Sequence, residues 1–337
     1  MKLFLYEHIT SGALIDEPLP TSLAREGNDM LTAIVQDLIQ LANIELILLR
    51  DIRLDPLENS ATHQLYTIDN LACFHRRYLD AINHADMVLA IAPETDDVLH
   101  KIQQQILNSG TQLLASHTEA TQISSDKYLC HQILTANGIS SPTTVKASEW
   151  SLNKFSSATG FIIKPQDGAG CIDTFFMTDS STLNTWLESH SNDLNNAIVQ
   201  PYIEGLTISL SLLADHNDIR VLAINQQNMT LNNDKLVFLG SIVNGVTETD
   251  LSFSQATKIA QNIHRAITGL WGFVGIDLII HQDELFVVDI NPRLTTSYIG
   301  LKQSLNHNPA ELLFTMMEKG CSALPQQLQR QAIEVKV

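Results

Sequence analysis

The sequence predicts a mixed α/β and α+β protein of 337 residues, which is long enough for two or three packed units. Three observations predict this class. Short apolar runs alternate with amphipathic helical segments up to about residue 117, a glycine-rich loop joins two apolar runs in the middle of the chain, and two apolar runs separated by a polar turn follow a long helix near the C-terminus.

The N-terminal segment has the rhythm of βαβ units. Strands are expected at 3–6, 44–49, 88–92 and 112–115, and helices at 30–42 and 97–107, where apolar residues recur at helical spacing. Such alternation indicates a parallel sheet covered by helices. The first strand is followed by EHITSG rather than G-x-G-x-x-G, and no Walker A loop occurs, so neither a dinucleotide site nor a P-loop is expected.

The middle segment begins with a helix start at Ser124-Ser125-Asp126, and Gly138 ends that helix. Two strands are expected next, at 161–164 and 172–177, and the loop 166–170 between them makes a hairpin the simplest arrangement. In the last third, strands are expected at 198–202, 208–213, 219–224, 274–280 and 285–290, and a helix at 254–270.

The last two strands carry a candidate metal site. If a three-residue turn pairs His281 with Leu285, then Asp277 lies opposite Asp289, and Asn291 joins them on the same face. Two acids facing each other destabilise a sheet unless a cation neutralises them, and Mg²⁺ prefers such oxygen ligands. The alternative is a pair of solvated acids on an exposed sheet face.

Lysines and glycines in the middle segment form a candidate phosphate site. Lys127 begins a helix, Lys164 ends a strand, and Gly168 and Gly170 lie in the loop that follows. Glycines let backbone N–H groups approach phosphate oxygens, and lysines supply the charge. Each lysine alone would be an ordinary surface residue. The segment QPYIEG, at a strand end, offers backbone groups to an adenine edge, although an ordinary strand–turn explains it equally well.

Charge limits the classes of partner. The net charge of −17 disfavours nucleic acid, and no apolar run approaches the roughly 20 residues of a membrane span, so a cytoplasmic protein is expected. A negative field attracts small cations such as amines. Small-molecule substrates, an amino acid and an amine, are therefore the expected partners, and a homodimer stays open.

The motifs SDK, FIIKPQDGAG, QPYIEG, GIDLII and VVDINPR follow one another in an order that resembles the ATP-grasp superfamily over roughly residues 120–300. The resemblance implies an N-terminal α/β domain at 1–117 and two lobes, 118–200 and 201–330, that clasp ATP with Mg²⁺ or Mn²⁺.

The resemblance also implies roles for individual residues. Phosphates would contact Lys127 and Lys164, the loop containing Asp167, Gly168 and Gly170 would close over them, and Arg293 with Lys164 would neutralise charge during phosphoryl transfer. Adenine would contact Gln200, Tyr202 and Ile203, and the metals would bind Asp277, Asp289 and Asn291. Two departures from the family pattern are Thr207, where many members bind the ribose with a glutamate, and Asp289, where glutamate is common.

The segments EHITSG, REGNDML, IAPETDDVL and INPRLTTSYIGL resemble the branch that includes the tyramine–glutamate ligases of methanofuran biosynthesis. That branch joins the γ-carboxyl of glutamate to a primary amine through an acyl phosphate, releasing ADP and phosphate. A dipeptide or D-alanine–D-alanine-like ligase, or a catalytically silent nucleotide-binding protein, remains as an alternative. Because ligands bind beyond the carboxyl ends of parallel strands, Glu7 and Glu94 are expected near the acceptor substrate, with Glu7 holding its amine.

Overall fold

Two sheets make up the fold in the computed structural model, which describes residues 1–57, 64–152, 155, 158–168, 170–190 and 194–337. The N-terminal sheet has five parallel strands in the order β3-β2-β1-β4-β5. The strands are β1 (Lys2–Glu7), β2 (Glu45–Asp51), β3 (Gln64–Ile68), β4 (Met87–Ile91) and β5 (Gln112–Leu113).

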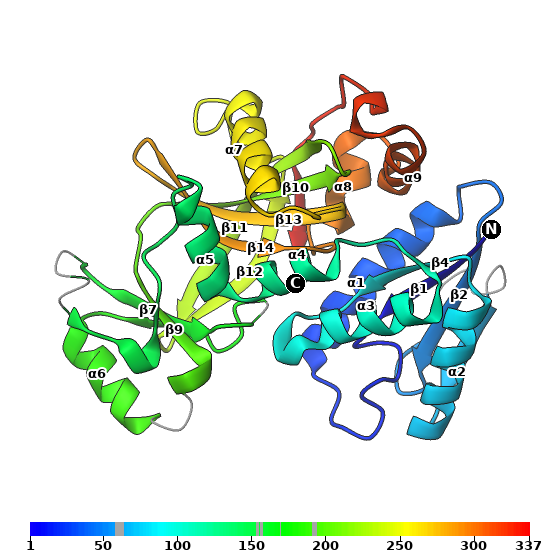
Figure 1. The fold of residues 1–337 in the computed structure, drawn as a ribbon, viewed down its shortest axis with the longest axis horizontal. Helices are drawn as coiled ribbons and strands as arrows, with labels where there is room; N and C mark the ends of the chain where they lie inside the picture. Colours follow the sequence, from blue (N-terminus) through cyan, green and yellow to red (C-terminus); the bar gives the residue numbers. More distant parts are fainter. Residues whose placement is uncertain (58–63, 153–154, 156–157, 169, 191–193) are drawn as a thin grey trace.

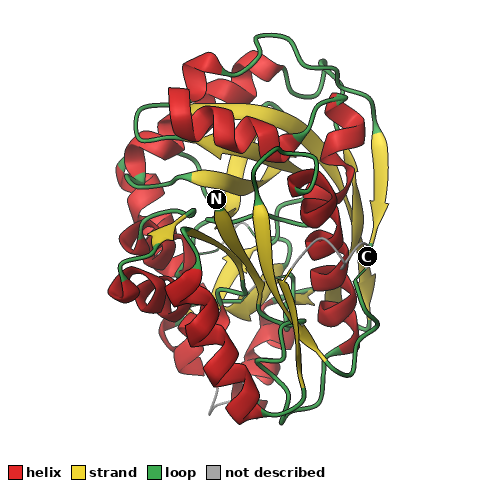
Figure 2. Ribbon diagram, turned by 90° about the vertical axis from the view of Figure 1, so that its right-hand side faces the viewer, coloured by secondary structure: helices red, strands yellow, loops and turns green. Residues whose placement is uncertain are grey.

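Helices cover both faces of this sheet, because alternate residues of its strands point to opposite sides. Leu3 and Leu5 share a core with α1 (Thr21–Leu38), whereas Phe4 and Tyr6 pack with α2 (Leu71–His84) and α3 (Val98–Ser109). Figure 1 shows α1 and α3 beside β1 and β4, and Figure 2 shows helices around the strands in the view turned by 90°. Burial on both faces explains why these strands read as continuous apolar runs.

The second sheet has ten strands, ordered β14-β13-β10-β11-β12-β8-β7-β9-β6, with β15 also paired to β12. Its neighbouring strands pair antiparallel, and the pair Lys235 and Phe175 connects β12 to β8. The strands are β6 (Val145–Lys146), β7 (Phe161–Pro165), β8 (Phe175–Met177), β9 (Ala197–Pro201), β10 (Leu206–Ala214), β11 (Ile219–Asn232), β12 (Lys235–Val243), β13 (Gly272–His281), β14 (Glu284–Asn291) and β15 (Ile333–Lys336).

Separate apolar cores anchor the two ends of this sheet. The helix α6 (Ser180–Ser189) packs on β7 and β9, and α7 (Phe253–Ala266) packs on β10, β11 and β13. Two short helices, α4 (Thr118–Ser125) and α5 (Lys127–Ala136), follow the N-terminal sheet. Two others, α8 (Tyr298–Leu305) and α9 (Pro309–Lys319), share the core of α1, so the C-terminal end of the chain packs against the N-terminal unit.

The predicted fold class is confirmed, although several predicted elements have different bounds. The first helix begins at Thr21 rather than at residue 30. The prediction missed its first turns because their residues are mostly small and polar and show little hydrophobic periodicity. Strand β11 extends eight residues past Ile224, and the strands β3 and β12 and the helix α2 were not predicted. The predicted β7–β8 hairpin is present, and its pairing is antiparallel.

The assumed turn of the β13–β14 hairpin is wrong. His281 pairs with Glu284 and not with Leu285. In a regular ladder this observed pairing would place Asp277 opposite a residue other than Asp289. An irregularity in the ladder between Asp277 and Leu278 restores the alignment, so Asp277 does pair with Asp289. As a consequence Val287 lies on the core face.

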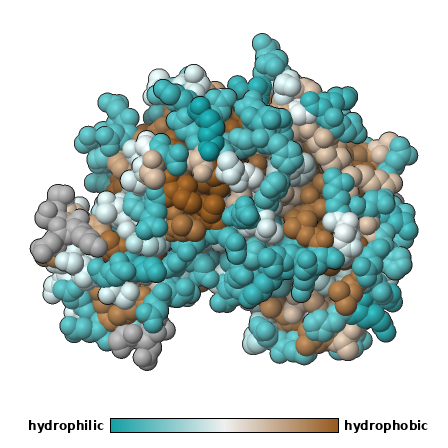
Figure 3. Space-filling model, in the orientation of Figure 1, coloured by the Kyte–Doolittle hydropathy of each residue, from teal (hydrophilic) through white to brown (hydrophobic). Residues whose placement is uncertain are grey.

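The surface of the protein is mainly hydrophilic on the face drawn in Figure 3. Hydrophilic residues cover most of the face drawn in Figure 3, and hydrophobic residues are visible mainly in hollows between them. Among the described residues, no helix combines the length and the apolar character that crossing a membrane requires.

Candidate active site

A pocket lies on the inner face of the second sheet and brings together residues from both halves of the chain. Its lining comes from the β7–β8 hairpin, the strands β9 to β14, the segment after β14 and the helices α1 and α5. Twelve of the thirteen residues predicted from the sequence line it, namely Lys127, Lys164, Gly168, Gly170, Gln200, Tyr202, Ile203, Thr207, Asp277, Asp289, Asn291 and Arg293.

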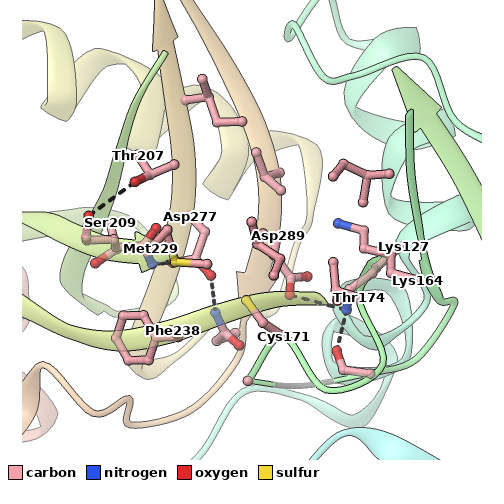
Figure 4. Close-up of a pocket in the computed structure, with 18 of the residues that line it drawn as sticks. Lys127, Lys164, Cys171, Thr174, Thr207, Ser209, Met229, Phe238, Asp277 and Asp289 are labelled. Atoms are coloured by element: carbon pink, nitrogen blue, oxygen red, sulfur yellow. Dashed lines mark hydrogen bonds and ion pairs between the residues drawn. The ribbon is translucent and has the colours of Figure 1, made fainter. Parts of the chain in front are cut away.

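Two carboxylates form the floor of the pocket. Asp277 on β13 and Asp289 on β14 are cross-strand partners, and Figure 4 shows both side chains projecting from neighbouring strands. The Asp277 carboxylate accepts hydrogen bonds from the side-chain amides of Gln227, at 2.9 Å, and Asn291, at 3.3 Å. Burial, and to a smaller extent the adjacent Asp289, raise the pKa of Asp277 to about 7, so the ionised form of this carboxyl is disfavoured in the pocket.

This arrangement fits a divalent cation. Mg²⁺ is held in proteins by one or two carboxylates together with substrate phosphates, and a bound cation would remove the repulsion between Asp277 and Asp289. The described residues contain no group of three or more His, Cys, Asp or Glu side chains that could hold a metal. Two carboxylates and the side-chain oxygen of Asn291 suit an ion that shares its remaining positions with phosphate and water.

Two lysines stand beside the carboxylates. The Lys127 ammonium lies 3.2 Å from the Asp289 carboxylate and donates to the carbonyl of Gly168 at 2.5 Å. Burial disfavours its charge, but Asp289 and Glu94 outweigh this effect and raise the pKa of Lys127. The helix α5 is held in place by its N-cap Asp126, whose side chain accepts from the amides of Tyr128 and Leu129, so Lys127 starts the helix at a fixed position.

Lys164 has a different environment. Its side chain is buried, and it makes no hydrogen bond or ion pair within the described part of the chain. Burial and the neighbouring Lys127 lower its pKa to about 8. A buried ammonium without a partner is unfavourable, and a phosphate oxygen in the pocket would supply the missing charge. Figure 4 shows Lys127 and Lys164 projecting side by side toward Asp289.

The loop after β7 contributes to the same wall. Gly168, Gly170 and Cys171 line the pocket, and Gly170 has a φ of 63°, which favours glycine. Ala169 lies outside the described residues. Asp167 is the one predicted residue that the structure does not bring into the pocket. Its carboxylate accepts from the amide of Asp96 at 3.0 Å and from the side chain of Asn196 at 3.3 Å, and so points toward the N-terminal unit.

The opposite end of the pocket is apolar. Gln200, Tyr202 and Ile203 lie there as predicted, and the Gln200 side chain donates to the hydroxyl of Thr144 at 2.9 Å. Thr207 donates to the carbonyl of Gln227 at 3.2 Å. Sequence reasoning missed the apolar residues that complete this end, although the alternating pattern of two adjacent strands could have identified them; they are Ile162, Met229, Leu236, Phe238, Leu278 and Ile279. Figure 4 shows Met229 and Phe238 on the side of Asp277 away from the lysines.

Arg293 lines the pocket but already has a partner. Its guanidinium makes two hydrogen bonds of 2.9 Å to the two carboxylate oxygens of Glu94, and both side chains are largely buried. Glu94 follows β4, so this bidentate pair joins the N-terminal unit to the end of β14. The sequence separation is 199 residues, and no local pattern could have revealed the pair. Burial opposes the charge of Arg293, but Glu94 outweighs it and raises the pKa.

Two further charged residues, Glu7 and Lys235, lie outside the pocket. Glu7 does not face an open substrate edge, because it is buried and its carboxylate accepts from the amides of Ile9 and Thr10 and from the Thr10 hydroxyl. Its part is to hold the turn after β1. Lys235, at the start of β12, is half exposed, contacts Asp173 at 3.4 Å and does not line the pocket.

The fold and the pocket together define the class of protein. Family models match two consecutive parts of the chain: an ATP-grasp domain at residues 124–297 and a pre ATP-grasp 3 domain at residues 44–121. The chain belongs to the ATP-grasp family.

Two named relatives and one solved structure are similar to this chain over much of its length. The tyramine–L-glutamate ligase of Methanocaldococcus jannaschii is 29% identical over 229 residues, which cover 68% of this chain and 61% of the relative. The enzyme of the same name from Methanocaldococcus fervens is 24% identical over 303 residues, which cover 89% of each chain. Among solved structures, an ATP-grasp superfamily protein from Archaeoglobus fulgidus has a TM-score of 0.70 at 23% identity, with 100% of this chain and 96% of that chain covered.

Proposed function

We propose that this chain is an ATP-dependent carboxylate–amine ligase that joins the γ-carboxyl of glutamate to a small primary amine such as tyramine. The observation that carries the proposal is the pocket itself, in which two facing carboxylates, two buried lysines and an apolar end lie in one cavity. Such a cavity suits one nucleotide with its metal-bound phosphates. The names of the two relatives support the choice of substrates. Methanofuran biosynthesis, which the sequence resemblance implies, is part of the proposal.

In this proposal the apolar end holds the adenine, between Ile203, Met229 and Phe238, and Thr207 lies near the ribose. The phosphates extend toward Lys127 and Lys164, under the loop that contains Gly168 and Gly170. Mg²⁺ or Mn²⁺ would be held by Asp277, Asp289 and Asn291, where it would neutralise phosphate charge.

The lysines are then the groups that act on the transferred phosphoryl. Phosphoryl transfer requires mainly positioning and charge stabilisation, and Lys164 is a buried cation for which the described residues provide no counter-ion. A substrate carboxylate oxygen attacks the γ-phosphorus and displaces ADP, which gives an acyl phosphate. The neutral amine nitrogen then attacks the acyl carbon, phosphate leaves, and the nitrogen loses a proton.

Arg293 is proposed to lie next to the reacting carboxylate. Because Glu94 already occupies its fork in two 2.9 Å hydrogen bonds, the guanidinium is held in one orientation at the end of β14. It can act on the substrate through the N–H groups and the charge that Glu94 does not engage.

The test is a reaction of the full chain with ATP, Mg²⁺, glutamate and a panel of amines, followed by phosphate release and mass spectrometry. We expect phosphate and a product with the mass of glutamate plus tyramine minus water. Chelation of the metal with EDTA should stop the reaction, and added Mg²⁺ should restore it.

The same assay separates the alternatives. Product with D-alanine or with two amino acids, and none with glutamate and an amine, would support a peptide-forming ligase and contradict the proposed substrates. Nucleotide binding without phosphate release for any acid and amine would contradict the ligase activity and favour a silent nucleotide-binding protein.

A further inference from the structure

The pocket continues past the carboxylates into a region that the nucleotide does not account for. This region lies beyond the end of β14 and is lined by Thr295, Thr296, Ser297, Arg293 and Glu26. Glu26 comes from α1, in the N-terminal unit, and is 270 residues from Thr296 in sequence. Apart from Asp277 and Asp289, it is the only carboxylate among the described residues that line the pocket.

The position of Glu26 is fixed by contacts on both ends of α1. Gly27 packs so closely on Glu7 that a Cβ atom there would come within 2.7 Å of the Glu7 carboxylate. Near the other end of the helix, Asp37 accepts a hydrogen bond of 2.8 Å from the Tyr298 hydroxyl. These contacts hold α1 against both the N-terminal sheet and the C-terminal helices, so the side chain of Glu26 enters the pocket from a rigid element.

The opposing wall is equally constrained. The Thr295 side chain would lie 2.6 Å from a Cβ atom at position 275, so the glycine at that position allows the 292–297 segment to pass close to β13. In that segment the Thr296 hydroxyl donates to one carboxylate oxygen of Glu26. Thr296 and Ser297 are buried, whereas Glu26 is partly exposed and is the acidic group at this end of the pocket.

The charge of Glu26 is not neutralised by the chain. Arg293 is close enough to interact electrostatically with Glu26, but its guanidinium makes its two side-chain hydrogen bonds to Glu94. Glu26 makes no ion pair with any lysine, arginine or histidine in the part of the chain that the structure describes. A partly buried carboxylate that keeps one oxygen bound to a hydroxyl and has no counter-ion is a site for a cation.

We propose that Glu26 and Thr296 form a subsite that binds a primary ammonium group of a substrate. The inference rests on the proposed function, because it assigns part of the same pocket. The metal is excluded as the occupant, since a hydroxyl and a single carboxylate supply fewer hard oxygen ligands than Asp277 and Asp289 do. The ammonium could belong to the amine acceptor or to the α-amino group of the acid, and the experiment separates these sources.

The experiment compares the wild-type chain with Glu26→Gln and with the control Asp29→Asn. Asp29 lies on the same helix and does not line the pocket, so the control removes the same charge from α1 without changing the subsite. The steady-state KM values for tyramine and for glutamate are measured by phosphate release. Binding of ATP is measured separately, in a titration that does not need turnover.

We expect Glu26→Gln to raise the KM of one ammonium-bearing substrate by about 10- to 100-fold, as loss of a charged hydrogen bond predicts, with ATP affinity within about twofold of wild type. A rise for tyramine assigns the subsite to the amine, and a rise for glutamate assigns it to the α-amino group. Asp29→Asn should match the wild type. Equal KM values for both substrates in Glu26→Gln and wild type would overturn the proposal while leaving the ligase activity standing.

A calorimetric arm keeps the two proposals separate if no turnover is found. With a non-hydrolysable ATP analogue bound, tyramine is compared with its neutral analogue 4-(2-hydroxyethyl)phenol, and glutamate with glutarate, which lacks the ammonium group. We expect the wild type to favour at least one ammonium compound over its neutral partner by about 10-fold or more, and Glu26→Gln to lose that preference. No preference in the wild type, or the same preference in the variant, would also overturn the subsite.

Discussion

At the residue scale, the site is organised by charges that the chain leaves partly uncompensated. Asp277 and Asp289 face each other across two strands, and the lysine nearest to them, Lys127, pairs with only one of them. Lys164 stands close by without an acidic partner among the described residues. A protein selected only for stability would not keep such an arrangement, because like charges opposite each other destabilise a sheet and buried unpaired charges are costly.

The first prediction concerns the two carboxylates. Asp277→Asn and Asp289→Asn should each lower phosphate release by at least about 100-fold, because each removes a charge that would hold the metal against the phosphates. The thermal unfolding midpoint of Asp277→Asn should not fall, since this change removes a repulsion, whereas Asp289→Asn also removes the ion-pair partner of Lys127. Phosphate release and thermal unfolding are measured for each variant beside Asp283→Asn, which changes an exposed acid in the turn of the same hairpin.

Near-normal phosphate release in both variants with Mg²⁺ present would contradict the proposed metal site. A lowered unfolding midpoint together with lost activity in Asp277→Asn would instead indicate that this carboxylate serves the fold, and its assignment to the metal would then be wrong.

At the scale of elements, the hairpin of β10 and β11 is fastened to the segment after α9 through one carboxylate. Asp215 accepts from the amides of Asn217, Asp218 and Cys321, the last at 2.5 Å. The sequence separation between Asp215 and Cys321 is 106 residues, so the contact closes a long loop of chain. Burial would raise the pKa of Asp215, but these amide hydrogen bonds outweigh it and lower the pKa.

The second prediction follows from that shift. Because the folded pKa of Asp215 lies below the unfolded value of about 3.9, its carboxylate stabilises the fold above that pH, and this stabilisation is lost as the pH falls through the folded pKa. Asp215→Asn should therefore lower the free energy of unfolding by about 1–3 kcal/mol at pH 7, and by less at pH 3 to 4. Urea unfolding at both pH values measures the difference.

The matched control is Asp234→Asn, at an exposed turn position with a φ of 64°, where asparagine is well tolerated. It should change the free energy of unfolding by less than about 0.5 kcal/mol at either pH. An Asp215→Asn effect that is equal at the two pH values would show that packing, and not the charge, carries the stabilisation.

At the scale of the whole molecule, contacts across the chain hold the N-terminal unit against the pocket. Glu94 pairs with Arg293, Glu26 accepts from Thr296, and Asp37 accepts from Tyr298 and lies 2.9 Å from the Lys302 ammonium. The apolar side of α1 shares one core with α8 and α9. Figure 1 shows α8 and α9 adjacent to the N-terminal unit although they are at the far end of the sequence. The proposed boundaries at residues 117 and 200 therefore divide a chain whose units are joined by polar contacts at the site.

The third prediction tests this attachment. Asp37→Ala should lower the free energy of unfolding by about 2–3 kcal/mol, because it leaves the buried Tyr298 hydroxyl without its acceptor and opens a gap beside α1. Lys302→Ala, which removes the more exposed partner of the same carboxylate, should cost less than about 1 kcal/mol. Denaturant midpoints for both variants provide the comparison, and equal losses would show that the ion pair, rather than the tyrosine contact, fastens the units.

The sequence by itself determined the fold class, the order of most strands and most of the predicted pocket residues. Apolar periodicity, glycine loops and the order of short motifs are local signals, and they sufficed for Lys127, Lys164, Asp277 and Asn291. Even the facing of Asp277 and Asp289 was predicted, although through a wrong turn that a ladder irregularity compensates. Alternation along a strand constrains which face a side chain takes, but it does not reveal where a ladder shifts.

Only the tertiary structure decided which distant groups meet. Glu26 carries no local signature, and the partner of Glu94 could not be read from its position after a strand. Glu7 and Asp167 look like site residues in sequence but bind elsewhere in the chain. A carboxylate beyond a strand end can bind its own turn, as Glu7 does, or pair with an arginine 199 residues away, as Glu94 does. Glu26, on a helix, instead meets the hydroxyl of a threonine 270 residues away. These outcomes depend on how α1, β4 and the end of β14 are brought together by packing of the apolar cores, and the partner of each charge is fixed by that packing rather than by its neighbours in sequence.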